Sequence, residues 1–122
     1  MSLVTEKKYL RTIYQLSLQK KKIRQIDLAL SLGYARSSIS IMVKHLIKED
    51  LIVIEDGFIF LTVKGMKIAK ESLQVHQKAY GWLMNQGFLA FEASEYATKI
   101  ADNFDEKFIK MLIEKNNTIL SY

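Results

Sequence analysis

Hydrophobic residues recur at helical spacing near the start of the chain. Tyr9, Ile13 and Leu16 follow one another at intervals of three or four residues, and Thr5 before them is a residue type that caps helices. This pattern predicts a first core helix over residues 5–19. The lysine-rich connection at residues 20–24 suits either a solvated loop or a segment that contacts phosphate groups.

Residues 23–48 predict two short helices joined by a tight turn. Leu28, Ala29 and Leu32 give the first helix an apolar face, and Gly33 can adopt the positive φ with which a helix ends. Helical spacing of about 100° per residue divides the second helix into two faces. Its apolar face consists of Ile39, Met42, Val43 and Leu46. Its polar face consists of Arg36, Ser37, Ser40, Lys44 and Lys48.

The polar face of this second helix carries arginine, lysine and serine, and no carboxylate precedes Glu49. Such a face suits a surface of phosphates and base edges. The alternative is the ordinary solvent-facing side of a helix. Features elsewhere in the sequence are needed to choose between these two interpretations.

The hydrophobic period changes between residues 51 and 62. Two runs of β-branched, aliphatic and aromatic residues flank Glu55, Asp56 and Gly57, and an Asp-Gly pair favours a tight hairpin turn. Three helices followed by a two-stranded ribbon is the order of a winged helix. The tip is acidic and does not suit base contact, whereas Lys64 or Lys67 beside it suits phosphate contact.

Three further helices are expected after the hairpin. Residues 62–65 open a long helix that Gly87 is expected to end, and residues 91–103 and 105–120 predict two more. The expected core positions of the long helix are Ile68, Ser72 or Leu73, Val75 or His76, Ala79 and Leu83. Apolar residues of the last helices include Phe104, Phe108, Met111, Leu112 and Ile119. They exceed what a winged helix needs to bury, so we expect pairing with a second copy; the alternative is a cap on the monomer's own core.

These patterns together predict a mainly α fold with a small β-hairpin. We expect an N-terminal winged helix-turn-helix DNA-binding domain at residues 1–65, followed by a helical dimerisation domain at residues 66–122.

Composition narrows the class of protein. The chain has 122 residues and no cysteine, which excludes disulfides, thiolate metal sites and a cysteine nucleophile. No run approaches the roughly 18 apolar residues of a membrane span, and the first residues lack the apolar segment of a signal peptide. We therefore expect a soluble, cytoplasmic protein with no membrane partner. Two histidines without a nucleophile motif or a carboxylate at a cooperating spacing give no reason to expect an enzyme.

Charge is distributed unevenly along the chain. Residues 1–78 carry 14 Lys and Arg against 7 Asp and Glu, whereas residues 79–122 carry 4 against 6. A basic half that is poor in aromatic residues on its polar helix face favours double-stranded DNA over single strands, which bind to aromatic stacking platforms. A membrane surface could also attract it, but no basic amphipathic helix with bulky apolar residues is evident.

Segments in both predicted domains carry a family resemblance. They are residues 9–14, 23–29, 32–33, 37–39, 42–46, 61–62 and 65–69. Their sequences resemble the metal-responsive repressors of the diphtheria-toxin-repressor and manganese-transport-regulator family. The resemblance runs from about residue 5 to residue 112 and is strongest in the winged helix. In length the chain is similar to the short members that lack an SH3-like third domain.

The resemblance implies a homodimeric repressor of operator DNA, and in this family DNA binding requires a filled binuclear Mn(II) or Fe(II) site. The manganese-type ligands come from the first helix, from a histidine in the long helix and from a Glu-x-x-Glu-His cluster in the next helix. The first-helix positions fall at Lys8 and Arg11, and the histidine is kept as His76. The cluster positions fall near Thr98, Ala101 and Asp102.

Most of these positions do not suit a divalent cation. Ammonium and guanidinium groups offer no lone pair, and hard cations need several carboxylates together. We therefore expect no standard binuclear site and assign no cofactor, although the resemblance implies Mn(II) or Fe(II). This leaves His76 and Asp102 as weak candidate ligands. DNA binding is then expected to be either independent of metal or controlled by a different effector. The favoured alternative for His76 is a partly buried helix histidine without a metal.

Lys8 and Arg11 bring positive charge to the place where the family binds its metal. We hypothesise that they pair with Asp102, Glu95 or Glu92 and tie the first helix to the later helices permanently. DNA binding would then be metal-independent.

The sequence thus predicts a DNA-binding transcriptional regulator, by resemblance a repressor, that acts as a homodimer. The residues expected to meet base edges and phosphates in the major groove are Arg36, Ser37, Ser38, Ser40 and Lys44. Those expected to contact the DNA backbone are Arg24, Gln25, Lys48 and Lys64. Ile41 suits either a thymine methyl contact or packing. The alternative function is a winged-helix module for protein–protein interaction that has lost metal-gated DNA binding.

Overall fold

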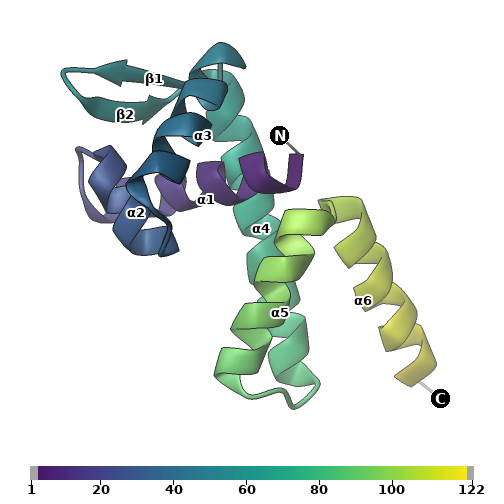
Figure 1. The fold of residues 1–122 in the computed structure, drawn as a ribbon. Helices are drawn as coiled ribbons and strands as arrows, with labels where there is room; N and C mark the ends of the chain where they lie inside the picture. Colours follow the sequence, from purple (N-terminus) through teal and green to yellow (C-terminus); the bar gives the residue numbers. More distant parts are fainter. Residues whose placement is uncertain (1–2, 121–122) are drawn as a thin grey trace. The chain divides into compact units, whose positions relative to one another are not determined.

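The computed structural model describes residues 3–120, and within them the chain forms six helices and one hairpin (Figure 1). The elements are α1 (Leu3–Gln19), α2 (Gln25–Leu32), α3 (Arg36–Lys48), β1 (Ile52–Glu55), β2 (Phe58–Leu61), α4 (Val63–Asn85), α5 (Ala90–Asn103) and α6 (Glu106–Leu120). The expected fold class, mainly α with a small β-hairpin, is confirmed.

The chain divides into two compact units, one ending at Lys70 and the next beginning at Glu71. Helix α4 runs through this division, and the domain boundary expected after residue 65 falls within its first turn. Unit 1 denotes the part up to Lys70 and unit 2 the part from Glu71. The functional roles of the two domains stay predictions.

The core of unit 1 is built from large aliphatic side chains. Leu10 and Ile13 of α1, Leu28 of α2 and Ile39 and Leu46 of α3 are almost fully buried, as the helical spacing predicts. The apolar face expected for α3 is confirmed. One detail at the start of the chain is wrong: α1 begins at Leu3, so Thr5 lies inside the first turn rather than at the cap.

The turn between α2 and α3 forms a helix-turn-helix. Gly33 has a φ of 71°, and its N–H donates to the Ala29 carbonyl at 2.9 Å, which ends α2 as expected. The chain then bends by 118° into α3, within the range of helix-turn-helix units. This bend leaves the polar side of α3 outside the core.

The hairpin forms the wing. Strands β1 and β2 pair antiparallel, with Ile54 opposite Ile59. Asp56 and Gly57 both adopt positive φ, at 51° and 81°, as a two-residue type I′ turn requires. The Ile59 N–H also donates to the Ile23 carbonyl at 2.7 Å, so the segment before α2 adds an isolated β-bridge to the free side of β2.

Helix α4 begins in close contact with the loop that follows α3. The Thr62 hydroxyl accepts the Gly65 N–H at 3.0 Å and caps the helix, while it donates to the Asp50 carbonyl at 2.7 Å. A Cβ at Gly65 would lie only 2.0 Å from the carbonyl oxygen of Leu51. Only glycine therefore fits at this approach of two backbones.

Unit 2 has a core of a different kind, in which alanines allow helices to approach closely. Ala79 of α4 packs in one cluster with Ala93, Ala97 and Ala101 of α5, and α5 lies along the C-terminal part of α4 (Figure 1). Gly87 adopts a φ of 95° after the end of α4, as expected. Of the alternatives left open for α4, the buried positions are Ser72 and Val75 rather than Leu73 and His76.

Candidate nucleic-acid interface

The polar face of α3 is open to solvent. The residues predicted there, Arg36, Ser37, Ser38, Lys44 and Lys48, are exposed, and Ser40 is half-buried. Ile41, left open between packing and thymine contact, is 59% exposed and does not belong to the core. Unit 1 therefore presents a helix whose inner side is apolar and whose outer side carries cations and hydroxyls.

A groove of about 460 Å³ lies beside the first turns of α3. It is lined by Arg24, Gln25, Ile26, Arg36, Ile39, Ser40 and Gly57. The groove brings two predicted backbone contacts, Arg24 and Gln25, together with two predicted base contacts, Arg36 and Ser40. The turn of the wing contributes Gly57, so three elements distant in sequence line the same surface.

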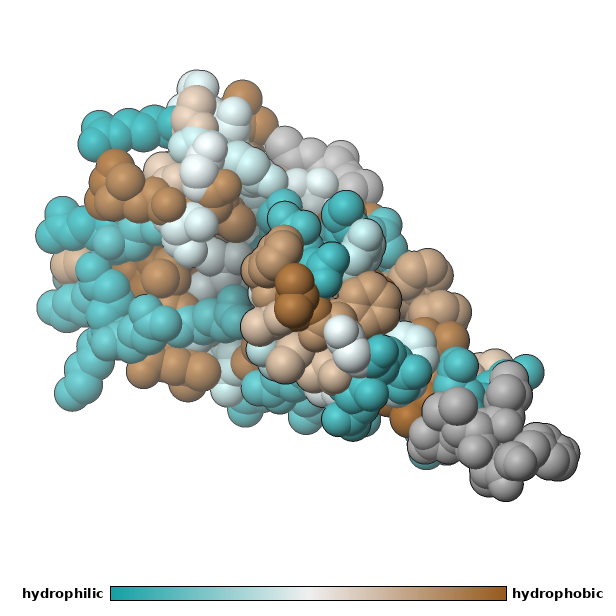
Figure 2. Space-filling model, turned by 90° about the horizontal axis from the view of Figure 1, so that it is seen from below, coloured by the Kyte–Doolittle hydropathy of each residue, from teal (hydrophilic) through white to brown (hydrophobic). Residues whose placement is uncertain are grey.

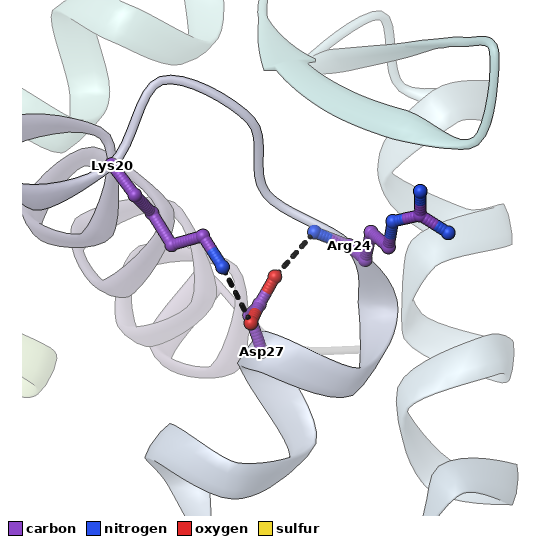
Figure 3. Close-up of polar contacts among 3 residues, drawn as sticks. All are labelled: Lys20, Arg24 and Asp27. Atoms are coloured by element: carbon purple, nitrogen blue, oxygen red, sulfur yellow. Dashed lines mark hydrogen bonds and ion pairs between the residues drawn. The ribbon is translucent and has the colours of Figure 1, made fainter.

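The start of α2 is fixed by Asp27. Its carboxylate accepts the backbone N–H of Arg24 at 2.8 Å and pairs with the Lys20 ammonium at 3.0 Å (Figure 3). The Arg24 N–H and the Lys20 ammonium hold the pKa of Asp27 below its usual value. Figure 3 shows the Arg24 side chain extending away from this contact, so its guanidinium is not used by Asp27.

The remaining residues predicted to contact DNA lie outside the groove beside α3. Lys44 and Lys48 lie on the exposed side of α3 beyond the groove residues. Lys64, at the start of α4, is exposed and donates to the Glu49 carbonyl at 3.2 Å. This bond holds the Lys64 ammonium next to the end of α3.

The wing carries a contact that the sequence analysis missed. The Phe58 ring is flanked by the Lys22 ammonium, 4.9 Å from its centroid, and by the Arg24 guanidinium carbon at 4.6 Å. The basic connection before α2 is thus held on the wing instead of being a free loop. An alternation of basic residues around the apolar Ile23 was the sequence signal for this extended segment.

Helix α1 is tied to the helix-turn-helix by side chains of its first turns. Glu6 pairs with His45 of α3 at 2.7 Å, although 39 residues separate them. The sequence analysis found no carboxylate at a spacing that cooperates with either histidine, and this pair corrects it for His45. Lys8 lies over the Tyr34 ring, 5.6 Å from its centroid, and the rings of Tyr9 and Tyr34 are 6.1 Å apart. Burial and the nearby Tyr34 raise the pKa of Tyr9.

The family's metal positions do not fit a metal ion here. Lys8 presents a cation to the Tyr34 ring, and Arg11 is 4% exposed. His76 is half-buried and Asp102 is 8% exposed, and both already make an interaction. Within residues 3–120, no three histidine, aspartate or glutamate side chains gather as a metal site requires.

No single helix in the described part of the chain is both long and apolar enough to cross a membrane. Helices α2 and α3 have the required length and apolar composition only when taken together as a pair bent by 118°. Their apolar side chains, such as Leu28 and Ile39, form the core of unit 1.

The helix-turn-helix, the wing and the exposed basic face define unit 1 as a winged helix-turn-helix domain of the DNA-binding type. Residues 2–56 match the family model described as iron dependent repressor, N-terminal DNA binding domain. Over 80 residues the chain is 34% identical to the transcriptional regulator MntR of two Escherichia coli strains, which covers 65% of this chain and 52% of theirs. These matches confirm the resemblance to the DtxR/MntR family of metal-dependent, DNA-binding transcriptional repressors, and within unit 1 the similarity is to the family's DNA-binding domain.

Solved structures of relatives share the fold beyond unit 1. T. acidophilum IdeR is similar with a TM-score of 0.78 and 30% identity, over 96% of this chain and 56% of that one. The manganese regulator SloR gives a TM-score of 0.78 and 29% identity, over 92% of this chain and 53% of that one. The chain spans about half the length of these relatives.

Proposed function

We propose that this protein is a repressor that binds operator DNA as a homodimer in the cytoplasm, without needing a metal ion. The observation that carries the proposal is the groove where Arg24 and Gln25 meet Arg36 and Ser40. In helix-turn-helix proteins the second helix enters the major groove and its first residues contact base edges. Here α3 has that role, and its N-terminal turns line the groove.

The residue types in the groove suit the two kinds of DNA contact. A guanidinium such as that of Arg36 can donate two hydrogen bonds to a guanine, while Ser40 can bond to any base. Arg24 and Gln25 at the start of α2 suit phosphate oxygens, which fix the position of a protein on the duplex. The charge supports this assignment, because residues 1–70 carry 13 Lys and Arg against 6 Asp and Glu.

The surface of unit 2 supports dimerisation. Phe88, Phe91, Tyr96, Phe104 and Phe108 are each at least 38% exposed although they are large and apolar or aromatic. Figure 2 shows hydrophobic side chains, in brown and tan, lying between hydrophilic ones on one face of the molecule. Exposed aromatic residues of this kind are enriched at protein interfaces. A second copy covering them would give the two-fold symmetry with which such repressors contact two half-sites.

The proposed independence from metal rests on α1. In this chain Glu6, Lys8 and Tyr9 hold α1 to the helix-turn-helix through direct contacts with His45 and Tyr34. The Lys8 ammonium has no lone pair with which to coordinate Mn(II) or Fe(II), and its positive charge would repel either ion. The position that serves metal binding in the family is thus part of a fixed contact.

The test is a measurement of DNA binding with and without metal. An operator is first selected from a random duplex library with the purified protein. Its affinity is then compared in EDTA and in Mn(II) or Fe(II) at constant ionic strength, with scrambled duplex as the control. We expect operator affinity at least 1,000-fold above that for scrambled duplex, equal in both conditions. A large gain with metal would refute metal independence, and no preference for any duplex would refute the function.

A second candidate function is supported by Ile41 and Ile47, which are 59% and 43% exposed on α3. Apolar side chains on an outward helix suit docking to another protein. In that case the basic face would bind duplex weakly and without sequence preference, a result that the same selection would reveal.

A further inference from the structure

The Phe58 ring of the wing is contacted by two cations from one short segment. The Lys22 ammonium and the Arg24 guanidinium lie 4.9 and 4.6 Å from its centroid. Both distances are within the roughly 6 Å over which a cation is attracted to an aromatic face. Two cations on one surface ring form a defined cluster that the contacts of α3 do not account for.

Backbone pairing explains why these side chains converge. The bridge between Ile23 and Ile59 extends the chain beside β2, and both isoleucines point into the core, at 1% and 2% exposed. Because side chains alternate along extended backbone, Lys22, Arg24 and Phe58 all fall on the opposite, outer side. Exposed Phe60 follows on the same side of β2.

The charge of this cluster favours an anion. Each cation lies within 5 Å of the same centroid, so the two charges are within 10 Å of each other, about one Debye length. The ring attracts each cation through its quadrupole but carries no net charge, so it orders the pair without neutralising it. A single phosphodiester set between Lys22 and Arg24 could accept hydrogen bonds from both cations, and its one negative charge would offset half of their combined positive charge.

The cluster is also next to the groove beside α3. Arg24 belongs to both, and Gly57, which lines the groove, precedes Phe58 directly. A duplex with one strand's bases at Arg36 and Ser40 would carry its backbone outward past this edge. The ligand class that fits is therefore a phosphodiester of the bound DNA.

We propose that Lys22, Arg24 and Phe58 form a phosphate clamp next to the turn of the wing, in which both cations bind one DNA phosphate and Phe58 is the positioning residue. The proposal rests on the proposed function and adds to it a site, a ligand and two residues, Lys22 and Phe58. The competing role for the same contacts is stabilisation of the wing alone.

The test compares Phe58→Leu with Phe60→Leu, a matched change on the same strand and side. Affinities for selected operator and scrambled duplex are measured between 50 and 200 mM salt, together with thermal unfolding. We expect Phe58→Leu to weaken binding to both duplexes by a similar factor of about 3 to 10, and to lower the slope of log affinity against log salt by about 1. Phe60→Leu should change neither, and Phe58→Tyr should retain the wild-type slope.

A double-mutant comparison separates the clamp from a structural role. Lys22→Ala should lower the slope by less than 1 in the wild type, since Arg24 still contacts the phosphate, and by much less again in Phe58→Leu, because the ring no longer positions the ammonium. An unchanged slope in both single variants, or a Phe58→Leu effect confined to the unfolding temperature, would overturn the clamp while leaving the proposed function standing. A wild-type protein that binds no duplex would overturn both.

Discussion

The two units of this chain differ in what they bury and in what they expose. Unit 1 buries large aliphatic side chains such as Leu10, Ile39 and Leu46, and its surface is basic. Unit 2 buries alanines, while aromatic side chains such as Phe91 and Tyr96 stay exposed. Residues 1–70 have a formal net charge of +7 and residues 71–122 of −2.

This difference supports the two partners proposed above, DNA for unit 1 and a second copy of the chain for unit 2. Unit 1 has a core of large aliphatic side chains of its own, although others such as Leu30 and Ile41 stay exposed, and its positive surface suits a polyanion. Alanines make up much of the core of unit 2, beside Val75, Leu83 and Ile109, and each alanine removes little apolar area from water. The exposed aromatic residues of unit 2 supply further buried area only when another surface covers them.

The largest expected effect lies at the close approach of two backbones at Gly65 in unit 1. Gly65→Ala would set a methyl group 2.0 Å from the Leu51 carbonyl oxygen, and that backbone atom has no rotamer with which to move away. We expect a loss of about 3 kcal/mol in the free energy of unfolding of unit 1. Urea unfolding followed by circular dichroism measures it. Gly81→Ala, with open space around its Cβ position, is the control and should be neutral or slightly stabilising. Equal stability of both variants would contradict the packing described here.

The second effect concerns the exposed aromatic surface of unit 2. Tyr96 lines an apolar groove of about 500 Å³ with Phe88, Phe104 and other residues, and it is 47% exposed. Tyr96→Glu should place an unpaired charge in the proposed dimer contact, give monomers in analytical ultracentrifugation and weaken operator binding about 100-fold. That factor corresponds to about 2.7 kcal/mol. Ser94→Glu, on a different side of α5, should leave the dimer intact. A wild-type monomer at micromolar concentration would remove the basis of this prediction.

The third effect separates base contacts from phosphate contacts on α3. Arg36→Ala should reduce the preference for operator over scrambled duplex by about 2 kcal/mol if its guanidinium bonds to a base. Lys44→Ala should weaken binding to both duplexes equally and lower the salt slope by about 1. Fluorescence anisotropy titrations at several salt concentrations measure both quantities. If neither variant loses affinity, the outer face of α3 is not the DNA contact.

The sequence was most informative where periodicity acts over short distances. The apolar face of α3, the turns at Gly33 and Asp56-Gly57 and the end of α4 all follow from local spacing and from backbone conformations that few residues adopt. It could not reveal contacts between segments far apart in the chain. Three such contacts depend on tertiary packing: the Glu6–His45 pair, the cation–π contact of Lys8 with Tyr34 and the cations around Phe58. The residues of the candidate interface were found by type, but only the fold brought Arg24 next to Arg36.

The smallest expected effect concerns a capping contact that both units contain, in which a carboxylate accepts a backbone N–H at the start of a helix. Asp27 accepts the Arg24 N–H at 2.8 Å at the start of α2, and Glu92 accepts the Leu89 N–H at 3.1 Å at the start of α5. Because the pKa of Asp27 is lowered in the folded protein, its carboxylate stabilises the fold above the unfolded-state pKa of about 3.9, and this contribution disappears as the pH falls through the lower folded-state value. Asp27→Ala should therefore cost about 1 kcal/mol at pH 7, most of it from the lost bond to the Arg24 N–H, since an exposed ion pair with Lys20 adds little.

The measurement is chemical unfolding of the wild type, Asp27→Ala and Glu92→Ala at pH values from 7 down to 2.5. The difference in the free energy of unfolding between the wild type and Asp27→Ala should stay constant down to about pH 5. It should shrink below pH 4, as the carboxyl group becomes protonated in the folded state too. Glu92→Ala reports the same kind of cap in the unit without the basic surface. If the free-energy difference between the wild type and Asp27→Ala stayed constant down to pH 2.5, the Asp27 side chain would act through packing alone. The charge of its carboxylate would then not be what positions Arg24 beside the groove.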